Sequence, residues 1–322
     1  VPVVLIVLAI SARHVPESRD PSSTGRLDLV GAALAAVGLA SLTYGLSAWS
    51  EQGLGSVAVL VGLGLGVLVL VGLVAWEARV ANPMLPLDIF SAPRFSVTNL
   101  VTFVVYAALG GIFFWLVVTL QVVAGWSALT AGLSLLPVTV LMLLFSPRAG
   151  VIGDRLGPRI PMTAGPLVAA VGVAMLVGLG PDATYVGNVL VPVSLLGAGL
   201  TLTVTPLTST VLGALDESRT GLASGVNNAV ARTGGLLLVA ALPALTGLTG
   251  FGDAAALEPA FRTAMIICAG LLALGGVIAA MGIRPSADHP PREDGPRAAR
   301  RHCAVDTTPV GIAHRSDAES RP

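Results

Sequence analysis

The residues best suited to chemistry lie in a short charged segment between two long apolar runs, Ser146–Met162, which reads SPRAGVIGDRLGPRIPM. Three arginines and one aspartate are concentrated there. Asp154 can accept hydrogen bonds from the N-terminus of a neighbouring helix and can pair with Arg155 or Arg159. Because such contacts form in one conformation and break in another, a network of them could bias a gate, although one exposed ion pair contributes only about 0 to 1 kcal/mol.

Three glycines share this segment, and they permit a close helix approach and a tight turn at a helix end. We therefore predict a gating loop between two helices. Its residues are Gly150, Gly153, Asp154, Arg155, Gly157 and Arg159. An ordinary basic turn on the cytoplasmic side is the alternative interpretation.

A second polar group, Asn227, Asn228 and Arg232, lies inside an apolar run. Arg232 is about eleven residues into that run, or roughly 16 Å at 1.5 Å per residue, which places it near the middle of a bilayer. A charge there costs at least about 2.5 to 3.5 kcal/mol, so we expect it to face a protein interior or a wet cavity. Spacings of three and four residues define one helical face, made of Gly221, Gly225, Asn228, Arg232 and Gly235. The face could pack on another part of the protein or coordinate a polar group.

The composition indicates that helices in a lipid bilayer hold the charged segment and the second polar group in place. Hydrophobic residues make up 54% of the 322-residue chain, charged residues only 11%, and the mean hydropathy is +0.85. The 38 glycines suit helices that approach each other closely in a bilayer. Neither cysteine has a ligand-like neighbour and all four histidines lie outside the apolar runs, so we predict no metal and no cofactor.

Apolar runs of membrane-spanning length predict the architecture. Eight such runs cover residues 27–48, 54–76, 96–121, 126–145, 160–180, 185–215, 221–248 and 261–283. A segment in lipid must satisfy its own backbone, and no alternating pattern suggests a barrel. The predicted fold class is therefore all-α, a polytopic transmembrane helix bundle. Residues 1–12 are too short to span and resemble the end of a truncated transmembrane helix.

The distribution of arginine predicts the orientation. Alternate gaps carry nine arginines, whereas the opposite gaps carry four acidic residues and one arginine. By the positive-inside rule the arginine-rich gaps are cytoplasmic in a multi-pass protein of the cell membrane. The tail, residues 284–322, is rich in Pro and Arg and is predicted to be disordered on the same side. We expect a lipid bilayer as partner and no nucleic acid.

The charged segment resembles the G-x-L-a-D-r-x-G-r-k loop of the major facilitator superfamily, with Pro158 where that family usually has a basic residue. Residues 221–235, GLASGVNNAVARTGG, and residues 76–90, WEARVANPMLPLDIF, resemble blocks of its fourteen-helix drug:proton antiporters, the EmrB/QacA-like branch. The resemblance implies the following organisation. Residues 1–12 end the sixth helix, 13–26 are a cytoplasmic loop, 27–76 two linker helices, 77–95 a cytoplasmic linker and 96–283 the C-terminal six-helix half. The first five helices would be missing.

The same resemblance implies that the first and fourth helices of this half line a central cavity. Side chains on one side of each give the candidate substrate residues Asn99, Phe103, Tyr106, Phe113, Thr201 and Thr205. Aromatic rings facing hydroxyl groups suit amphiphilic or cationic organic compounds. The alternative is that the rings belong to the bundle core and that each threonine bonds its own helix backbone.

Acidic residues between positions 96 and 283 all fall in predicted loops, so this segment lacks an embedded carboxylate for proton exchange. The resemblance places those acids in the missing N-terminal half, which would supply the protons. The predicted function is proton-coupled efflux of amphiphilic or cationic drugs by the C-terminal portion of a transporter. A non-transporting remnant, or an assembly partner of a separately encoded half, is the alternative. An enzyme is disfavoured because the spans contain no catalytic acid pair, HExxH or Ser/His arrangement.

Overall fold

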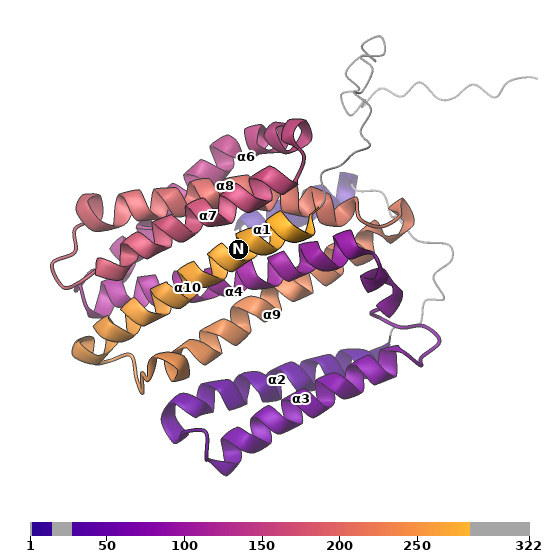
Figure 1. The fold of residues 1–322 in the computed structure, drawn as a ribbon, viewed down its shortest axis with the longest axis horizontal. Helices are drawn as coiled ribbons and strands as arrows, with labels where there is room; N and C mark the ends of the chain where they lie inside the picture. Colours follow the sequence, from indigo (N-terminus) through magenta and orange to yellow (C-terminus); the bar gives the residue numbers. More distant parts are fainter. Residues whose placement is uncertain (1, 15–27, 284–322) are drawn as a thin grey trace, which may run out of the picture. The chain divides into compact units, whose positions relative to one another are not determined.

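The structure is a computed structural model that describes residues 2–14 and 28–283 (Figure 1). The predicted tail, and all but the first two residues of the predicted loop 13–26, lie outside the described residues. Regular structure in the described part is helical. The long elements are α1 (Pro2–His14), α2 (Leu29–Gln52), α3 (Val57–Glu77), α4 (Pro93–Val122), α6 (Leu136–Leu156), α7 (Arg159–Met175), α8 (Leu190–Leu212), α9 (Thr220–Thr246) and α10 (Ala254–Gly282). The short ones are η1 (Leu87–Ser91), α5 (Ala128–Leu133), η2 (Leu176–Gly178), η3 (Tyr185–Val189) and η4 (Glu217–Arg219).

Eight segments of the described chain are long and apolar enough to cross a membrane, which confirms the predicted all-α transmembrane bundle. Most of their ends lie within a few residues of the prediction. The fourth differs, because it runs from Ala128 to Leu156 and consists of α5 and α6 separated by Ser134 and Leu135. Pro137 has no amide hydrogen for the carbonyl four residues earlier, so the helix restarts there.

Helix α4 is the centre of the bundle, and about three-fifths of its apolar window is buried (61%). It packs on α9 and α10, while α7 packs on α8 and α10. The α4–α9 contact depends on two glycines. A Cβ on Gly110 would lie 2.7 Å from the Cα of Gly235, so the two backbones touch where neither residue has a side chain.

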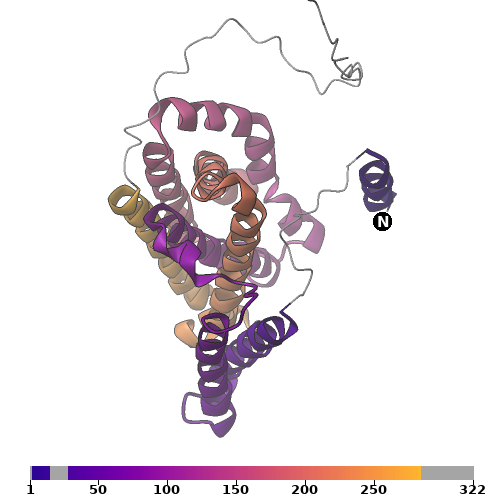
Figure 2. The ribbon, with the colours of Figure 1, turned by 90° about the vertical axis from the view of Figure 1, so that its right-hand side faces the viewer.

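Helices α2 and α3 form an antiparallel hairpin that contacts the bundle through α2 and α9 (Figures 1 and 2). Their closest approach is again made by glycine, since a Cβ on Gly62 would lie 2.9 Å from the Cα of Gly45. The outer face of α3 is unpartnered among the described helices, with Val67, Val71 and Val74 each more than half exposed. In a bilayer such a face contacts lipid.

Candidate functional site

The predicted gating loop is mostly helical, which corrects its secondary structure. Helix α6 continues through Gly150, Gly153, Asp154 and Arg155 to Leu156, and α7 begins at Arg159. Only Gly157 and Pro158 separate the two helices. Gly157 has φ +75°, a conformation that glycine adopts at little cost, and this residue makes the predicted tight turn.

The glycines of this segment also make the predicted close approach to another helix. A Cβ on Gly153 would lie 3.2 Å from Cγ of Pro206 in α8, and one on Gly150 would lie 3.5 Å from Cγ2 of Thr205. Helix α6 therefore meets α8 through its small residues.

The charged side chains of the segment have different partners from those predicted. Arg159 donates from Nε to the carbonyl oxygen of Ala280 in α10, at 2.9 Å. Asp154 and Arg155 are exposed, and neither makes a hydrogen bond or ion pair within the described residues. In this conformation Asp154 is thus unpaired, and Arg159 joins α7 to α10.

A polar junction joins α9 to α4. Asn227 donates from Nδ2 to Oδ1 of Asn99, at 3.2 Å, and to Oγ1 of Thr102, at 2.7 Å. Asn99 also donates to the carbonyl of Phe95 at 3.0 Å, and Thr102 to that of Thr98 at 3.0 Å. Sequence reasoning selected Asn99 and Asn227 for different roles and missed Thr102. No local pattern connects residues that lie more than 120 positions apart.

The neighbouring face of α9 is open. Gly221 and Gly225 have nothing within 4 Å of a built Cβ, and the side chains of Asn228 and Arg232 are exposed without a hydrogen bond in the described chain. Arg232 lies about 18 Å along α9 from Thr220 at about 1.5 Å per residue, so it is in mid-helix. Of the predicted face, Gly221, Gly225, Asn228 and Arg232 are thus open, whereas Gly235 packs on Gly110 of α4.

The six candidate cavity residues divide into two groups. Asn99 and Thr201 are each only 4% exposed, so the structure corrects their placement on a cavity wall. Asn99 belongs to the α4–α9 junction, and Thr201 donates to the carbonyl of Gly197 in its own helix at 2.8 Å. The remaining four residues are partly exposed and stay candidates: Phe103, Tyr106, Phe113 and Thr205.

The acidic residues are close to, but not all within, the predicted loops. Asp154 lies in the last turn of α6, and Glu258 is the fifth residue of α10, so the loop assignment is wrong for these two. Across residues 28–283, every Asp and Glu lies at a helix end or between helices. The described chain consequently has no carboxylate in the middle of a span.

Contacts of the linker were not foreseen from the sequence. Asp28 accepts hydrogen bonds from the Trp76 indole at 3.1 and 3.2 Å and from the amide of Gly31 at 2.8 Å, which joins the start of α2 to the end of α3. The buried Glu77 accepts from the amide of Leu85 at 3.0 Å. An aspartate immediately before an apolar helix is a usual N-cap, so the sequence could have predicted the role of Asp28 at the start of α2.

Among the described residues, an ion pair joins the linker to the bundle. Arg219 donates from Nη1 to Oδ2 of Asp88, at 2.6 Å, and this connects η1 with the turn before α9. The hydrogen bond from Arg219, together with its charge, lowers the pKa of the Asp88 carboxyl below its ordinary value. Both side chains are about half exposed, so the pair adds little to the stability of the fold. Its main effect is to set the position of the linker against the bundle.

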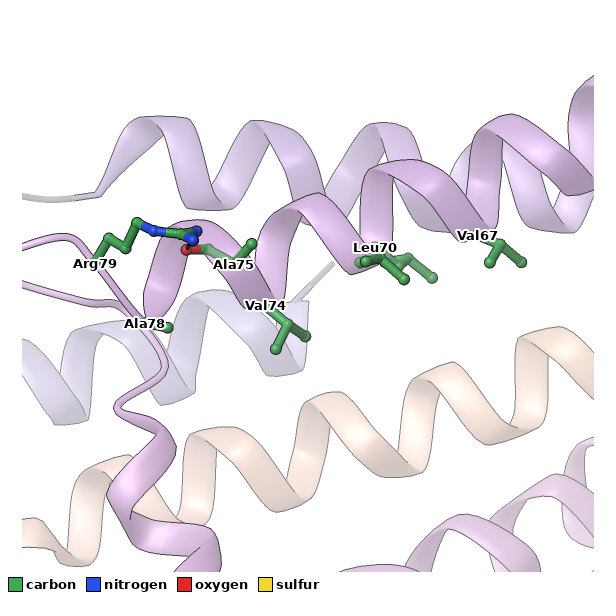
Figure 3. Close-up of a pocket in the computed structure, with 7 residues that line it drawn as sticks. Val67, Leu70, Val74, Ala75, Ala78 and Arg79 are labelled. Carbon is green, nitrogen blue, oxygen red and sulfur yellow. Dashed lines mark hydrogen bonds between the residues drawn. The ribbon is translucent and has the colours of Figure 1, made fainter.

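The outer flank of α3 forms an open hollow with an apolar wall (Figure 3). Its wall consists of Val67, Leu70, Val74, Ala75 and Ala78, and Arg79 lies at the end (Figure 3). Arg79 donates from Nη1 to the carbonyl of Ala75 at 2.9 Å. The apolar side chains are suited to contact with lipid chains, and Arg79 is suited to the membrane interface. The wall offers no polar group that could orient a transported molecule.

The family of the chain follows from its sequence match. The model of the Major Facilitator Superfamily matches residues 3–240, which is most of the chain. The chain belongs to the Major Facilitator Superfamily. This superfamily consists of membrane transport proteins, which agrees with the prediction that the chain is not an enzyme.

Similar proteins in this superfamily export antibiotics and drugs. The chain is 35% identical to the cephamycin export protein CmcT of Amycolatopsis lactamdurans, over 83% of this chain and 55% of the relative. It is 30% identical to the puromycin resistance protein pur8 of Streptomyces alboniger, over 86% and 58%. It is 29% identical to the multidrug efflux pump LfrA of Mycolicibacterium smegmatis, over 93% and 58%. The chain thus spans about half the length of these relatives.

Proposed function

We propose that this chain is the C-terminal portion of a proton-coupled exporter of amphiphilic or cationic drugs, in the fourteen-helix EmrB/QacA-like branch. One observation carries the proposal. The mid-helix Arg232 and its neighbour Asn228 are exposed on a face of α9 that no described helix covers. Because a bare charge in lipid is costly, this face is suited to meeting another half of the same transporter across a hydrated space.

The two parts of the described chain fit distinct roles in this proposal. Helices α4 to α10 supply the C-terminal six-helix half, and the α2–α3 hairpin supplies the two linker helices. Residues 1–12 are then the end of the preceding helix. The helix ends that carry most of the arginines face the cytoplasm, as does the tail, and the protein is multi-pass in the cell membrane.

Candidate substrate contacts lie on the partly exposed sides of α4 and α8. Phe103, Tyr106 and Phe113 follow one side of α4 and offer ring faces to a flat or cationic compound. Thr205 offers a hydroxyl from α8. The names of the relatives support small organic substrates, since they are described as exporting cephamycin or resisting puromycin.

Proton coupling requires a group outside the described chain. Its acids occupy helix ends or lie between helices, and none is in the middle of a span, so none is suited to binding a proton in alternation with substrate. The N-terminal half supplies that group in this proposal. Asp154, Arg155, Gly157 and Arg159 serve as a gate, because α6 and α7 meet at a two-residue turn whose exposed Asp154 is free to find another partner.

The test restores the coding sequence upstream of Val1 and measures ethidium export from a bacterium whose own major pumps have been deleted. We expect export that stops when a protonophore collapses the proton gradient, and that falls at least about tenfold in R232A, since one charge contact of about 1.4 kcal/mol would account for that factor. Arg94→Ala, which removes an exposed arginine outside the gate and the α9 face, is the matched control and should export as the unaltered protein does. Absence of export above vector level, with the protein present in the membrane, contradicts the proposal.

A further inference from the structure

A groove of about 350 Å³ lies between α2 of the linker hairpin and α9 of the bundle, near the ends where α2 finishes and α9 turns into α10. Figure 1 shows these two helices side by side, and their residues are in direct contact. The groove is on the hairpin side of α9, so it is separate from the candidate cavity residues on α4 and α8. Its volume is within the range of about 300 to 1,000 Å³ that holds a small organic molecule.

One wall of the groove is polar although it belongs to a membrane helix. Thr43, Ser47 and Glu51 follow one another at four-residue intervals along α2, so they share one face. The hydroxyls of Thr43 and Ser47 and the carboxylate of Glu51 make no hydrogen bond or ion pair within the described residues. Lipid and an apolar neighbouring helix would offer no hydrogen-bond partner to this polar face.

The facing wall is apolar and aromatic. Leu236 of α9 forms its side, and Phe114 of α4 and Phe251 of the α9–α10 turn close one end. The rings of Phe114 and Phe251 meet edge to face, with centroids 5.4 Å apart. That arrangement holds the turn against α4 and leaves ring surface toward the groove. Ring faces attract cations, most strongly where water is excluded.

Charge at this end of the described chain is mostly negative. Besides Glu51, this end carries Asp182, Asp253 and Glu258, and Arg262 is its one basic residue. Of these acids, Glu51 is the one that lines the groove, so it is placed to pair with a bound cation.

We propose that the groove between α2 and α9 is a binding site for an amphiphilic organic cation. The positive group lies near Glu51, and the apolar body lies between Phe251 and Leu236. This inference rests on the proposed efflux function and deepens it, because it gives the linker hairpin a direct role at the end of the bundle that faces away from the arginine-rich loops. Substrate would occupy the groove on its way out.

The test measures ethidium binding to the purified chain in detergent by fluorescence. Glu51→Gln keeps the shape and removes the charge, and we expect it to weaken binding about three- to fivefold, the effect of losing up to about 1 kcal/mol from an exposed charge pair. Glu51→Asp should restore part of the loss. F251A should weaken binding by a similar factor through the lost ring contact. Glu258→Gln, an equal charge change at the same end but outside the groove, should bind as the wild type does.

A second measurement locates the ligand without relying on affinity. Ser47→Cys, with Cys303 changed to Ser, places one thiol in the groove, since Cys268 is fully buried. Ethidium should slow the labelling of that thiol by a maleimide. Unchanged affinity in E51Q, an equal loss in E258Q, or labelling that ethidium does not slow would each overturn the site. Because binding needs no transport, these results are independent of the export test, and failure of one does not imply failure of the other.

Discussion

Replacing Asn227 by alanine removes the side chain that, among the residues the structure describes, donates hydrogen bonds from α9 to α4 at the polar junction. Two hydrogen bonds are lost, at 3.2 Å to Asn99 and 2.7 Å to Thr102. Between membrane helices such bonds average about 0.6 kcal/mol each. Oδ1 of Asn99 is left in a residue that is 4% exposed, and a buried acceptor without a donor costs about 1 to 3 kcal/mol. We therefore expect N227A to lose about 1 to 3 kcal/mol of unfolding free energy.

The assay is reversible unfolding in mixed detergent, followed by circular dichroism. Asn228→Ala is the matched control, because Asn228 is the adjacent residue, is exposed and has no hydrogen bond in the described chain. It should change stability by less than about 0.5 kcal/mol. A double-mutant cycle with Asn99→Ala should show a coupling of about 1 to 3 kcal/mol, because removing Asn99 also removes the acceptor that N227A leaves unpaired. Equal stabilities of N227A and N228A would refute the reasoning, since only the junction distinguishes the two positions.

Three further changes test the helix contacts and the linker. Gly110→Ala places a methyl group 2.7 Å from Gly235, so it should cost about 1 to 3 kcal/mol, whereas Gly270→Ala, in open space on α10, should be neutral or stabilising in the same unfolding assay. Gly157→Ala forces φ +75° on a residue with a side chain and should cost about 1 to 2 kcal/mol; no measurable loss would show that the α6–α7 turn relaxes freely. The pKa of Asp88 is lower in the folded protein than its ordinary value of 3.8. Its contribution to the free energy of unfolding is therefore complete above pH 3.8, and it is lost as the pH falls through the pKa of the folded state. Asp88→Asn should flatten that part of the pH profile, and an unchanged profile would contradict the assignment.

Much of the fold could be predicted because the bilayer allows few alternatives. An apolar run in lipid must bond its own backbone, so composition and length predict the helices, and eight spans were found where eight were expected. The α6–α7 segment was less accessible to this reasoning. Its charges suggest a loop, but a helix can carry charges on its exposed side, and only Gly157, with its positive φ, interrupts the backbone.

The candidate site shows where prediction from the sequence ends. Helical periodicity grouped Asn228 with Arg232, and the structure leaves both exposed. Periodicity cannot say which flank of α9 meets α4, so it gave no reason to prefer Asn227 as the residue that makes the contact. The placement of Asn99 and Thr201 on a cavity wall was an error of the same type. A residue on the selected face of a helix can still be covered by a neighbouring helix.

By itself the sequence determined the class of the protein, its spans, the tight turn at Gly157 and the arginine in the middle of α9. These follow from local rules, because hydrophobic length, helical period and the conformational freedom of glycine act within a few residues. Only the tertiary structure decided that Asn227 bonds Thr102, that Arg159 bonds the backbone of Ala280, and that α2 turns a hydroxyl face toward α9. Those contacts join residues more than 100 positions apart, and they depend on which helices the packing of small residues brings together.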